Sequence, residues 1–340
     1  MDANGERKVT ISAIAKEAGV SVPTVSRVVN GRSDVAPSTR RRVEELLRQH
    51  DYRRRATRSR NKARLVDLVF NDLDSPWSVE IIRGVEEVAH TAGVGTVVSA
   101  IHRKSEPIRQ WQQNLRTRAS DGVILVNSTL DSSAQEELRR LNVPLVVVDP
   151  AGGLSFDVPA IGATNWAGGL SAMEHLLGLG HRRIGIVSGP RAMMCSRARL
   201  DGYRAGLEST GLTIDDELLW EGDFYHASGF AGAQAFLRLP ERPTAILASS
   251  DQMAIGAYEA VRQAGLRVPD DVSIVGFDDL PEVRWASPPL TTVRQPLAEM
   301  GAVAVRTVLR LAAGEPLDSP RLELATTLIP RESTAPPRQN

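Results

Sequence analysis

The sequence has few of the features that mark secreted or membrane proteins. It contains a single cysteine, Cys195, so no disulfide can form within the chain, and one thiol fits a reducing compartment. Residues 1–13 hold no apolar stretch after a basic start, which argues against a secretory signal. No apolar run approaches the roughly 18 residues that a bilayer-spanning helix needs. We therefore expect a cytoplasmic protein with no membrane partner.

The motifs of common enzymes and metal sites are also missing from the sequence. The six histidines stand at positions 50, 90, 102, 175, 181 and 226, and none belongs to an HExxH pattern or another metal-binding spacing. The sequence has neither a Walker loop for nucleotide phosphates nor a GxSxG nucleophile elbow. We expect no enzymatic activity, no metal and no cofactor.

Charge is balanced over the whole chain but unevenly distributed along it. The 340 residues carry a formal net charge of +0, yet residues 1–64 contain 16 Lys and Arg against 7 Asp and Glu. The rest of the chain therefore has a matching acidic excess. A basic arm on an acidic body indicates a polyanion as the partner of the arm alone. A solvated charged face is the simpler reading, but it would not explain why the excess lies beside two unusually short helical segments.

The basic arm contains two short stretches of helical spacing, in IAKEAGVSVPTVSRVVNG (residues 14–31). We predict a first helix over Ile11–Glu17, capped by Thr10, because a threonine hydroxyl can accept from the free N–H groups of the first turn. A second helix is predicted over Val22–Val29, capped in the same way by Ser21. Helices of about two turns are not stable alone, so they need a supporting core.

A third helix completes this small module. Gly19 can take the left-handed conformation that a tight turn between the first two helices needs. A helix from about Pro37 to His50 would then close the core, with its proline suited to the first helical position. The predicted inward residues of the three helices are Ile14, Ala15, Val20, Val25, Val28, Val43, Leu46 and Leu47.

This arrangement is a helix-turn-helix with a supporting helix, and it predicts a reading head for the major groove of DNA. Hydroxyls can reach phosphates or bases, an arginine can fork onto guanine, and small apolar groups can contact a thymine methyl. An unspecific helical cap is the alternative. The predicted DNA contacts in this module are Thr10, Ser21, Val22, Pro23, Thr24, Ser26, Arg27 and Asn30.

From Leu65 onward, short β-branched runs alternate with segments of helical spacing. Near-continuous apolar strands between helices are typical of parallel sheets that are covered on both faces. Ligands of such folds bind at the carboxyl ends of the strands. The predicted strands are 65–70, 95–100, 122–126, 144–149, 183–189, 244–249 and 272–277, and the predicted helices include 78–92, 166–180, 195–211, 228–238 and 251–265.

The order of these segments predicts two successive open sheets, over about 65–160 and about 161–290, and therefore a body of two lobes. The stretches TTVRQP and LELATTLIP, near 291–330, would cross between the lobes. The predicted fold class is α plus α/β, with a three-helix head, a basic hinge and a two-lobed body of parallel doubly wound sheets.

Several motifs resemble the lactose/galactose-repressor (LacI/GalR) family of bacterial transcription regulators. VTISAIAKEAGVSVPTVSRVVNG is similar to the N-terminal signature of that family, and EHLLGLGHRRIGIVSGP, SRARLDGYRAGL, ASSDQMAIGAYEAVRQAGLRVPDDVSIVGFDD and PPLTTVRQP follow in the family's order and spacing. The resemblance covers nearly the whole chain. It implies a helix-turn-helix domain over 1–52, a hinge over 53–64, and an effector-binding and dimerisation domain of periplasmic-binding-protein architecture over 65–335.

The hinge departs from the family pattern. RRRATRSRNKAR (53–64) has seven basic residues in twelve, but Asn61 stands where the family places a leucine that wedges into the minor groove of DNA. Phosphate neutralisation is therefore expected in place of apolar intercalation, and operator binding should depend steeply on salt. The predicted phosphate contacts are Arg53, Arg54, Arg55, Arg58, Arg60 and Lys62.

The resemblance also implies a ligand site at the strand ends of the body. Carboxylates and amides suit the hydroxyls of a polyhydroxylated ligand, an arginine donates a fork, and aromatic faces pack on sugar C–H groups. The family often has asparagine where Ser250 stands, so the side chain that would contact the ligand is shorter here. The predicted effector contacts are Asn71, Ser75, Trp77, Asn127, Asp149, Trp166, Arg199, Phe224, Ser250, Asp278 and Gln295.

Each of these residues also has a structural explanation. Asp251 can be only a helix cap, Arg199 can simply pair with a carboxylate, and Trp77 can be ordinary packing between lobes. Trp166 and Trp285 are equally consistent with either role. Cys195, near the predicted cleft, is interpreted as a small buried residue with no redox function.

The sequence therefore predicts a repressor whose affinity for operator DNA is changed by a small sugar bound between two lobes. A head of this size binds one half-site, so we expect a homodimer on a pseudo-palindromic operator, with helix 78–92 at the dimer contact. The C-terminal segment has no leucine heptads for tetramerisation. Control by a protein partner or by a non-sugar corepressor remains open, whereas a solute-binding protein would lack residues 1–60.

Overall fold

The computed structural model describes residues 11–29, 35–50, 64–102, 105–127, 136, 138, 140–141, 143–152 and 158–338. The chain divides into two compact units, residues 1–61 and residues 62–340. The described part of the first unit is the head, and the described part of the second is the body.

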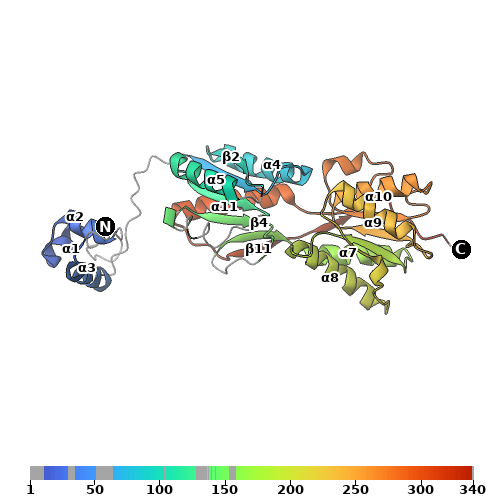
Figure 1. The fold of residues 1–340 in the computed structure, drawn as a ribbon, viewed down its shortest axis with the longest axis horizontal. Helices are drawn as coiled ribbons and strands as arrows, with labels where there is room; N and C mark the ends of the chain where they lie inside the picture. Colours follow the sequence, from blue (N-terminus) through green and yellow to red (C-terminus); the bar gives the residue numbers. More distant parts are fainter. Residues whose placement is uncertain are drawn as a thin grey trace. The chain divides into compact units, whose positions relative to one another are not determined.

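The head consists of three helices, α1 (Ile11–Ala18), α2 (Val22–Val29) and α3 (Pro37–Gln49) (Figure 1). The three predicted helices are confirmed, and their bounds differ from the prediction by single residues. Ile14, Ala15, Val25, Val28 and Val43 are buried, and Val20, Leu46 and Leu47 pack at the edge of this core as predicted.

Local chemistry explains why α2 begins where it does. The Ser21 hydroxyl accepts a hydrogen bond from the backbone N–H of Thr24 at 3.3 Å, as an N-cap does. Gly19 has φ +66°, so the turn before α2 uses the left-handed conformation that glycine adopts without strain. Thr10 and Asn30, and the predicted hinge contacts Arg53, Arg54, Arg55, Arg58, Arg60 and Lys62, lie outside the described residues.

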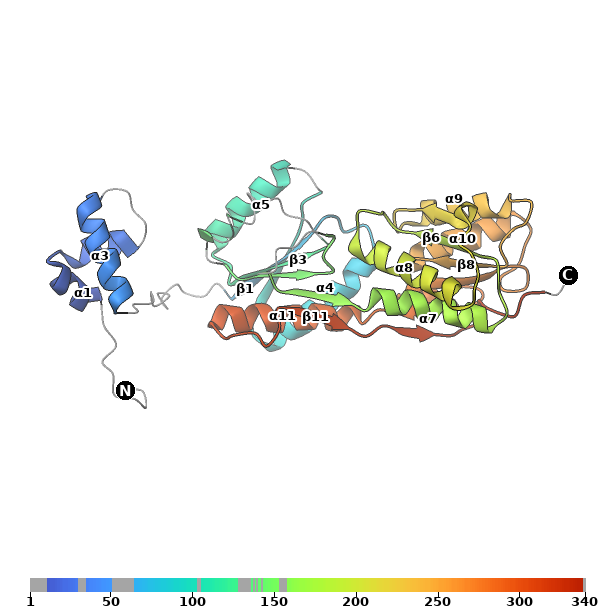
Figure 2. The ribbon, with the colours of Figure 1, turned by 90° about the horizontal axis from the view of Figure 1, so that it is seen from below.

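The first lobe of the body is built on a six-stranded parallel sheet. Its strands are β1 (Leu65–Phe70), β2 (Gly95–Ala100), β3 (Gly122–Val126), β4 (Leu145–Val148), β5 (Ala160–Ala163) and β11 (Arg321–Leu324), in the order β11-β5-β4-β3-β1-β2. The helices α4 (Pro76–Thr91) and α11 (Leu297–Ala313) cover one face, and α5 (Ser105–Arg118) covers the other (Figure 2).

The second lobe is built on a second six-stranded sheet. Its strands are β6 (Ile184–Ser188), β7 (Leu219–Glu221), β8 (Ala245–Ala248), β9 (Ser273–Asp278), β10 (Thr291–Arg294) and β12 (Thr327–Ile329), in the order β12-β10-β9-β8-β6-β7. The helices α7 (Asn165–Gly178) and α8 (Met194–Ser209) cover one face, and α9 (His226–Leu237) and α10 (Asp251–Gln263) cover the other. Strands β10 and β12 pair antiparallel.

Both lobes bury their strands on two faces. In β1, Val66 and Leu68 contribute to the core under α4 and α11, whereas Val69 contributes to the core under α5. In β8, Ile246 and Leu247 divide in the same way between the two cores of the second lobe. Because successive side chains of a strand point to opposite faces, a strand covered on both sides must be apolar throughout, which confirms the reading of the apolar runs.

The chain passes between the two lobes three times. Some of the strands beside these crossings are too short to be recognised in the sequence. β5 is the last strand of the first sheet before α7 opens the second lobe, so this part of the first lobe runs to Ala163, near the expected boundary of about 160. After β10 the chain returns to the first lobe as α11 and β11, and then crosses back as β12; these crossings lie at the two stretches expected to cross. The strands β5, β7 and β10 have three or four residues, too few for a recognisable alternation of side chains.

The crossing segments are tied to one another. The Thr164 hydroxyl accepts from the backbone N–H of Thr326 at 2.9 Å, and the Thr326 hydroxyl donates to the Thr164 carbonyl at 3.1 Å. In the part of the chain that the structure describes, no helix combines the length and apolar character needed to cross a membrane.

Candidate ligand site and nucleic-acid interface

One face of α2 is open in the head. Ser21, Val22, Pro23 and Arg27 are exposed, and Thr24 and Ser26 are half-buried. The opposite face carries Val25 and Val28 into the core against α1 and α3, so helical periodicity itself turns the polar residues outward. The structure thus brings six of the predicted DNA contacts together on one surface.

The supporting helix is also tied to the first helix. His50 follows α3, and its Nε2 lies 2.7 Å from Oε2 of Glu17 in α1. This contact joins the ends of the two helices that hold α2 in place.

In the body, several predicted ligand contacts lie at strand ends in an unusual backbone conformation. Asn127, Asp149, Phe224 and Asp278 have φ of 47°, 47°, 75° and 125°. Positive φ is costly for residues other than glycine and is found mainly where the surrounding structure needs a particular side-chain direction. Four of the eight described residues of this kind belong to the predicted site.

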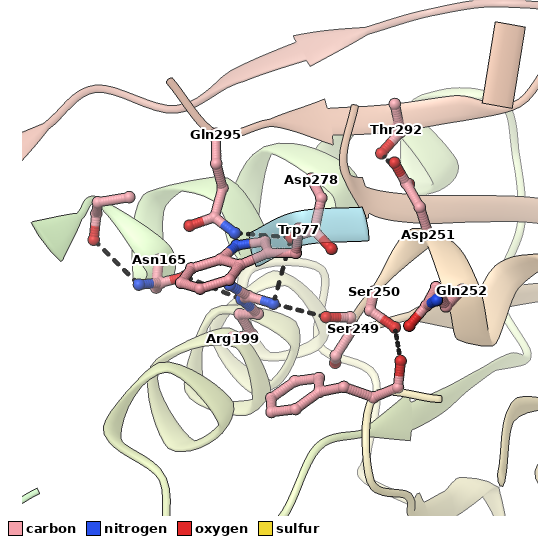
Figure 3. Close-up of polar contacts among 12 residues, drawn as sticks. Trp77, Asn165, Arg199, Ser249, Ser250, Asp251, Gln252, Asp278, Thr292 and Gln295 are labelled. Carbon is pink, nitrogen blue, oxygen red and sulfur yellow. Dashed lines mark hydrogen bonds and ion pairs between the residues drawn. The ribbon is translucent and has the colours of Figure 1, made fainter. Parts of the chain in front are cut away.

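Arg199 interacts with three members of this group, Asp149, Phe224 and Asp278, and its side chain is only 4% exposed. Its Nε donates to Oδ1 of Asn165 at 2.8 Å, and Nη1 donates to the carbonyl of Ser249 at 2.6 Å (Figure 3). The guanidinium carbon lies 3.8 Å from the ring centroid of Phe277 and 5.7 Å from that of Phe224. The cation is therefore held mainly by neutral acceptors and aromatic faces.

Close packing of two helices positions this arginine. A Cβ on Gly169 of α7 would lie 2.6 Å from the backbone oxygen of Arg199 in α8, so only glycine allows this approach. The first turn of α7 also supplies Asn165, whose Nδ2 donates to the carbonyl of Ala163 and so presents Oδ1 to Arg199.

Two buried carboxyl groups flank Arg199. Oδ1 of Asp278 lies 4.0 Å from the guanidinium and accepts from Nε2 of Gln295 at 2.6 Å. Burial raises the pKa of Asp278 to about 7 against the opposing effect of Arg199. Burial likewise raises the pKa of Asp149, again with Arg199 acting in the opposite direction.

The Cys195 thiol contributes to the same cluster. It lies near the carboxyl group of Asp149, and burial raises the pKa of the thiol to about 12. A thiol with such a pKa stays protonated and unreactive at neutral pH, which agrees with the predicted lack of a redox role.

Several polar atoms in this region have no protein partner. Among the described residues, Asn127 Oδ1, Ser196 Oγ, Ser249 Oγ and Gln295 Oε1 are buried without a hydrogen bond. Buried polar atoms are nearly always paired, and Ser249 and Gln295 belong to the hydrogen-bond network of Arg199, so their unpaired atoms indicate that another molecule completes their bonds.

Direct contacts join the two lobes beside this cluster. The Tyr225 hydroxyl donates to Oδ1 of Asp72 at 2.9 Å, and the Ser75 hydroxyl donates to Oε1 of Gln252 at 3.4 Å. Ser75 also caps α4 through the N–H of Trp77. Asp72 follows the first predicted strand and belongs to the polar strand ends, but its partner Tyr225 and the Ser75 partner Gln252 could not be selected from the sequence, because residues so far apart in the chain share no spacing.

Ser250 and Asp251 have structural duties. The Ser250 hydroxyl caps α10 by accepting from the N–H of Met253 and donates to the carbonyl of Phe224. The Asp251 carboxylate accepts from the N–H of Leu280 and from the Thr292 hydroxyl. The structural alternative for Asp251 is therefore supported, and ligand contact by Ser250 stays a prediction.

The remaining aromatic and amide candidates differ in how deeply their side chains are buried. Trp77 packs against the core of the first lobe and is drawn with the Arg199 group in Figure 3, and Asn71 donates from Nδ2 to the carbonyl of Asn127. Trp166 and Trp285 are 48% and 81% exposed, so burial does not place them with the Arg199 group. The predicted site lacks Asn165 and Ser249, although each stands next to a predicted site position, Trp166 and Ser250.

A separate cavity of about 170 Å³ lies in the second lobe, lined by His226, Asp251, Gln252, Ile255, Glu282 and Val283. Among the described residues, no group of three or more His, Cys, Asp or Glu side chains is arranged to hold a metal ion.

Comparison with known proteins adds an independent observation. Residues 10–55 match the model of bacterial regulatory proteins of the lacI family, and residues 173–334 match that of a periplasmic binding protein-like domain. The chain is 32% identical over 332 residues to the HTH-type transcriptional repressor CytR of Escherichia coli (strain K12), which covers 97% of each chain.

Two solved structures are similar over nearly the whole length. The transcriptional regulator CelR–cellobiose complex has a TM-score of 0.74 at 32% identity, covering 96% of this chain and 99% of that one. The lac repressor dimer bound to operator and an anti-inducer has a TM-score of 0.71 at 30% identity, covering 97% and 100%.

Proposed function

This chain belongs to the LacI family of bacterial regulatory proteins, and we propose that it is a repressor whose operator affinity is set by a sugar bound around Arg199. It is a DNA-binding transcriptional regulator and not an enzyme. Since such a regulator acts on the chromosome, we place it in the cytoplasm.

The unpaired polar atoms around Arg199 carry the proposal of an effector. Amide and hydroxyl groups that are buried without partners lose free energy unless a ligand pairs with them, about 1–3 kcal/mol for each group. A sugar supplies several hydroxyls in a small volume, and each can donate and accept. The similarity to a regulator in complex with cellobiose supports this chemistry.

The open face of α2 supports the proposal of a DNA-reading head. Ser21, Val22, Pro23, Thr24, Ser26 and Arg27 present small and basic groups from a helix narrow enough for the major groove. One head reads one half-site, so a dimer on a pseudo-palindromic operator is the assembly that we propose, with α4 at the dimer contact. The similarity to a dimeric repressor bound to operator agrees with this assembly.

The two functions are coupled in this proposal through the lobes. The effector contacts come from both lobes, with Asn127 and Asp149 in the first and Arg199 in the second. A ligand that contacts both lobes favours one angle between them over others, because it binds that angle more tightly. In a dimer, a change of this angle alters the spacing that the two hinges offer to the operator.

The basic side chains of α11 do not favour control by an anionic protein partner at this helix. On α11, Arg306 pairs with Glu299, and Arg310 lies 3.6 Å from both Glu315 and Asp318. Basic side chains that already have acidic neighbours offer little attraction to an added negative charge.

Operator binding by the full chain tests the proposal. We expect specific binding to an inverted repeat, with log affinity falling steeply against log salt because many phosphates are neutralised. Arg27→Ala should weaken specific binding by about 10- to 100-fold, while Arg262→Ala, an exposed arginine of the body paired with Glu259, should leave it unchanged.

The same assay with cellobiose and other sugars gives the sign of the effector's action. A sugar that lowers operator affinity is an inducer, and one that raises it is a corepressor. If the protein showed no preference for any inverted repeat over random duplex, with or without sugar, the proposed function would be wrong.

A further inference from the structure

We infer that the second lobe adds a self-complementary contact to the dimer, in which Trp285 of each protomer enters the cavity that α9, α10 and the segment before Trp285 form in the other protomer. The proposed function places α4 at the dimer contact. The present contact rests on that function, because it needs a dimer, and it extends the interface to a second surface. Three features support it: an exposed ring, a cavity on the same surface and the connection of that cavity to α4.

Trp285 projects from a loop that is held at both ends. Its side chain is 81% exposed, and it follows the short helix η2 (Pro281–Arg284). The backbone N–H of Trp285 donates to the carbonyl of Glu282 at 3.0 Å, and the N–H of Leu290 donates to the carbonyl of Val283 at 3.1 Å. A single exposed apolar side chain is ordinary, so the meaning of this ring depends on the surface around it.

The cavity of about 170 Å³ lies on the same surface as this ring. Glu282 and Val283 of η2 line it, directly before the loop that carries Trp285. The other walls come from the start of α9, at His226, and from the first turns of α10. Because the Trp285 ring is exposed, it does not fill the cavity of its own chain. A projecting ring and a cavity therefore stand side by side.

The lining of the cavity suits an indole ring. Ile255 and Val283 supply apolar walls, whereas the side chains of Gln252 and Glu282 supply oxygen acceptors. An indole combines a flat apolar body with one N–H donor, and that donor usually has a partner when the ring is buried. The cavity offers both kinds of contact within one small volume, so its chemistry matches the side chain that projects beside it.

A two-fold axis satisfies the ring and the cavity at the same time. In an isologous dimer the same surface lies on both sides of the interface, and each contact occurs twice. If Trp285 of one protomer enters the second protomer's cavity, the second protomer's ring enters the first cavity in return. A ring and a cavity on distant surfaces would produce an open chain of subunits instead. Their adjacency therefore favours a second copy of this chain as the occupant.

The cavity also adjoins the helix that we propose at the dimer contact. Gln252 of its lining accepts a hydrogen bond from the Ser75 hydroxyl at 3.4 Å, and Ser75 is the N-cap of α4. Val79, one turn further along α4, has a side chain that is 58% exposed. A tryptophan buries about 150–250 Å², whereas a stable interface buries about 1,200–2,000 Å² in total. Two inserted rings thus need a neighbouring surface, and α4 provides it.

Self-association of the full chain, measured by analytical ultracentrifugation, tests the inference. Trp285→Ala should raise the dissociation constant of the dimer about 100-fold or more, because each dimer loses two buried tryptophans. Leu322→Ala, at an exposed position of β11 in the first lobe, is the control and should leave the constant unchanged.

The outcomes separate this contact from the proposed function. An unchanged dissociation constant in Trp285→Ala overturns the inference and leaves the proposed dimeric regulator standing. A wild-type chain that binds an operator half-site and remains a monomer contradicts both the proposed dimer and this contact.

A mixture of two variants tests whether the ring and the cavity are partners. Ile255→Trp fills the cavity from within and should weaken the homodimer as well. In a mixed dimer, Trp285 of the Ile255→Trp protomer meets the open cavity of the Trp285→Ala protomer, and the filled cavity meets no ring. Native mass spectrometry should therefore show more mixed dimers than random pairing gives.

Random pairing of the two variants would contradict the insertion of Trp285 into the cavity. The result for Trp285→Ala decides alone if Ile255→Trp does not fold, because removal of an exposed side chain has little effect on the stability of the protomer.

Discussion

The two lobes of the body have the same strand order but hold their polar residues in different ways. In the second lobe, Arg199 connects Asn165, Ser249 and Asp278 into one buried network. In the first lobe, Asn127 follows its strand with an unpaired side-chain oxygen, and the Asp149 carboxyl group interacts with Arg199 and Cys195 of the second lobe. The second lobe thus carries a site that is already organised, whereas the first presents groups that find partners across the lobe contact.

This difference shows how one topology can divide a binding task. When the strands of each lobe are numbered in chain order, both sheets have the order 2-1-3-4-5, with β11 or β12 added beyond the fifth strand. Sheets of this order bring polar side chains to the carboxyl ends of their parallel strands in both lobes. Which lobe is rigid is decided by the side chains, because a connected network resists rearrangement more than separate turn residues do. We expect substitutions in the second lobe to affect stability and those in the first lobe to affect ligand affinity.

The largest effect is expected for Arg199→Ala. Removing this side chain leaves the buried oxygen atoms of Asn165 and Ser249 without donors, so the free energy of unfolding should fall by about 1–3 kcal/mol for each of these acceptors. Effector binding should be lost. Chemical denaturation of the full chain and thermal shift with sugar measure the two effects.

Arg204→Ala is the matched control for this variant. Arg204 lies on the same helix, is exposed, and pairs with Asp201 at 3.0 Å. An exposed pair of this kind contributes at most about 1 kcal/mol. Equal losses of stability in the two variants would contradict a special role for the buried arginine.

Asn127→Ala and Asn165→Ala compare one amide from each lobe. The side-chain oxygen of Asn127 has no protein partner, so its removal should change the free energy of unfolding by about 1 kcal/mol or less, while lowering effector affinity about tenfold. Asn165→Ala breaks the bond to Arg199 and should cost about 1–3 kcal/mol of stability. Denaturation midpoints and calorimetry on both variants measure these effects. A larger loss of stability in Asn127→Ala than in Asn165→Ala would contradict the proposed division between the lobes.

Tyr225→Phe tests the direct bond between the lobes. The variant loses the hydrogen bond to Asp72, and the arrangement with the lobes in contact should be less favoured by about 0.5–1.5 kcal/mol. Effector affinity should fall correspondingly, by about two- to tenfold. Tyr258→Phe is the control, because its hydroxyl donates within the second lobe to the carbonyl of Pro288. A similar fall in affinity for both variants would show that lobe contact is not the cause.

The smallest effect is a pH dependence that Asp278→Asn should remove. Burial raises the pKa of Asp278 from 3.8 to about 7, so the folded protein holds a proton there that the unfolded chain releases. The stabilising contribution is complete below about pH 4 and is lost as the pH rises through about 7.

Relative to the wild type, Asp278→Asn should gain stability between pH 5 and pH 8. The gain should be about 1 kcal/mol, or about 2–4 °C in Tm, since neighbouring carboxyl groups share the titration. Parallel Tm curves over this range would contradict the assignment.

Much of the fold could be predicted from local patterns. Helical spacing with a serine cap and a glycine turn defined α2, and continuous apolar runs defined strands such as β1 and β3. The missed elements have specific causes. β5 and β7 are too short to show a period, and α5 has few apolar residues to define a face.

The candidate site was predictable only in part. Its strand-end residues, such as Asn127 and Asp278, were found because parallel sheets concentrate function there and because the motifs resemble a known family. The partners Asn165, Ser249 and Tyr225 were not predicted, because they meet their partners through contacts between segments that are distant in the chain.

The sequence by itself determined the basic three-helix head, the parallel sheets of the body and the absence of metal and catalytic motifs, because these depend on spacing and composition along the chain. The tertiary structure decided that Arg199 is held by neutral acceptors, that Asp251 serves the fold, and that the free atoms of Asn127 and Gln295 are acceptors. Burial and hydrogen bonding set these properties, and both depend on which distant residues are brought together when the chain folds.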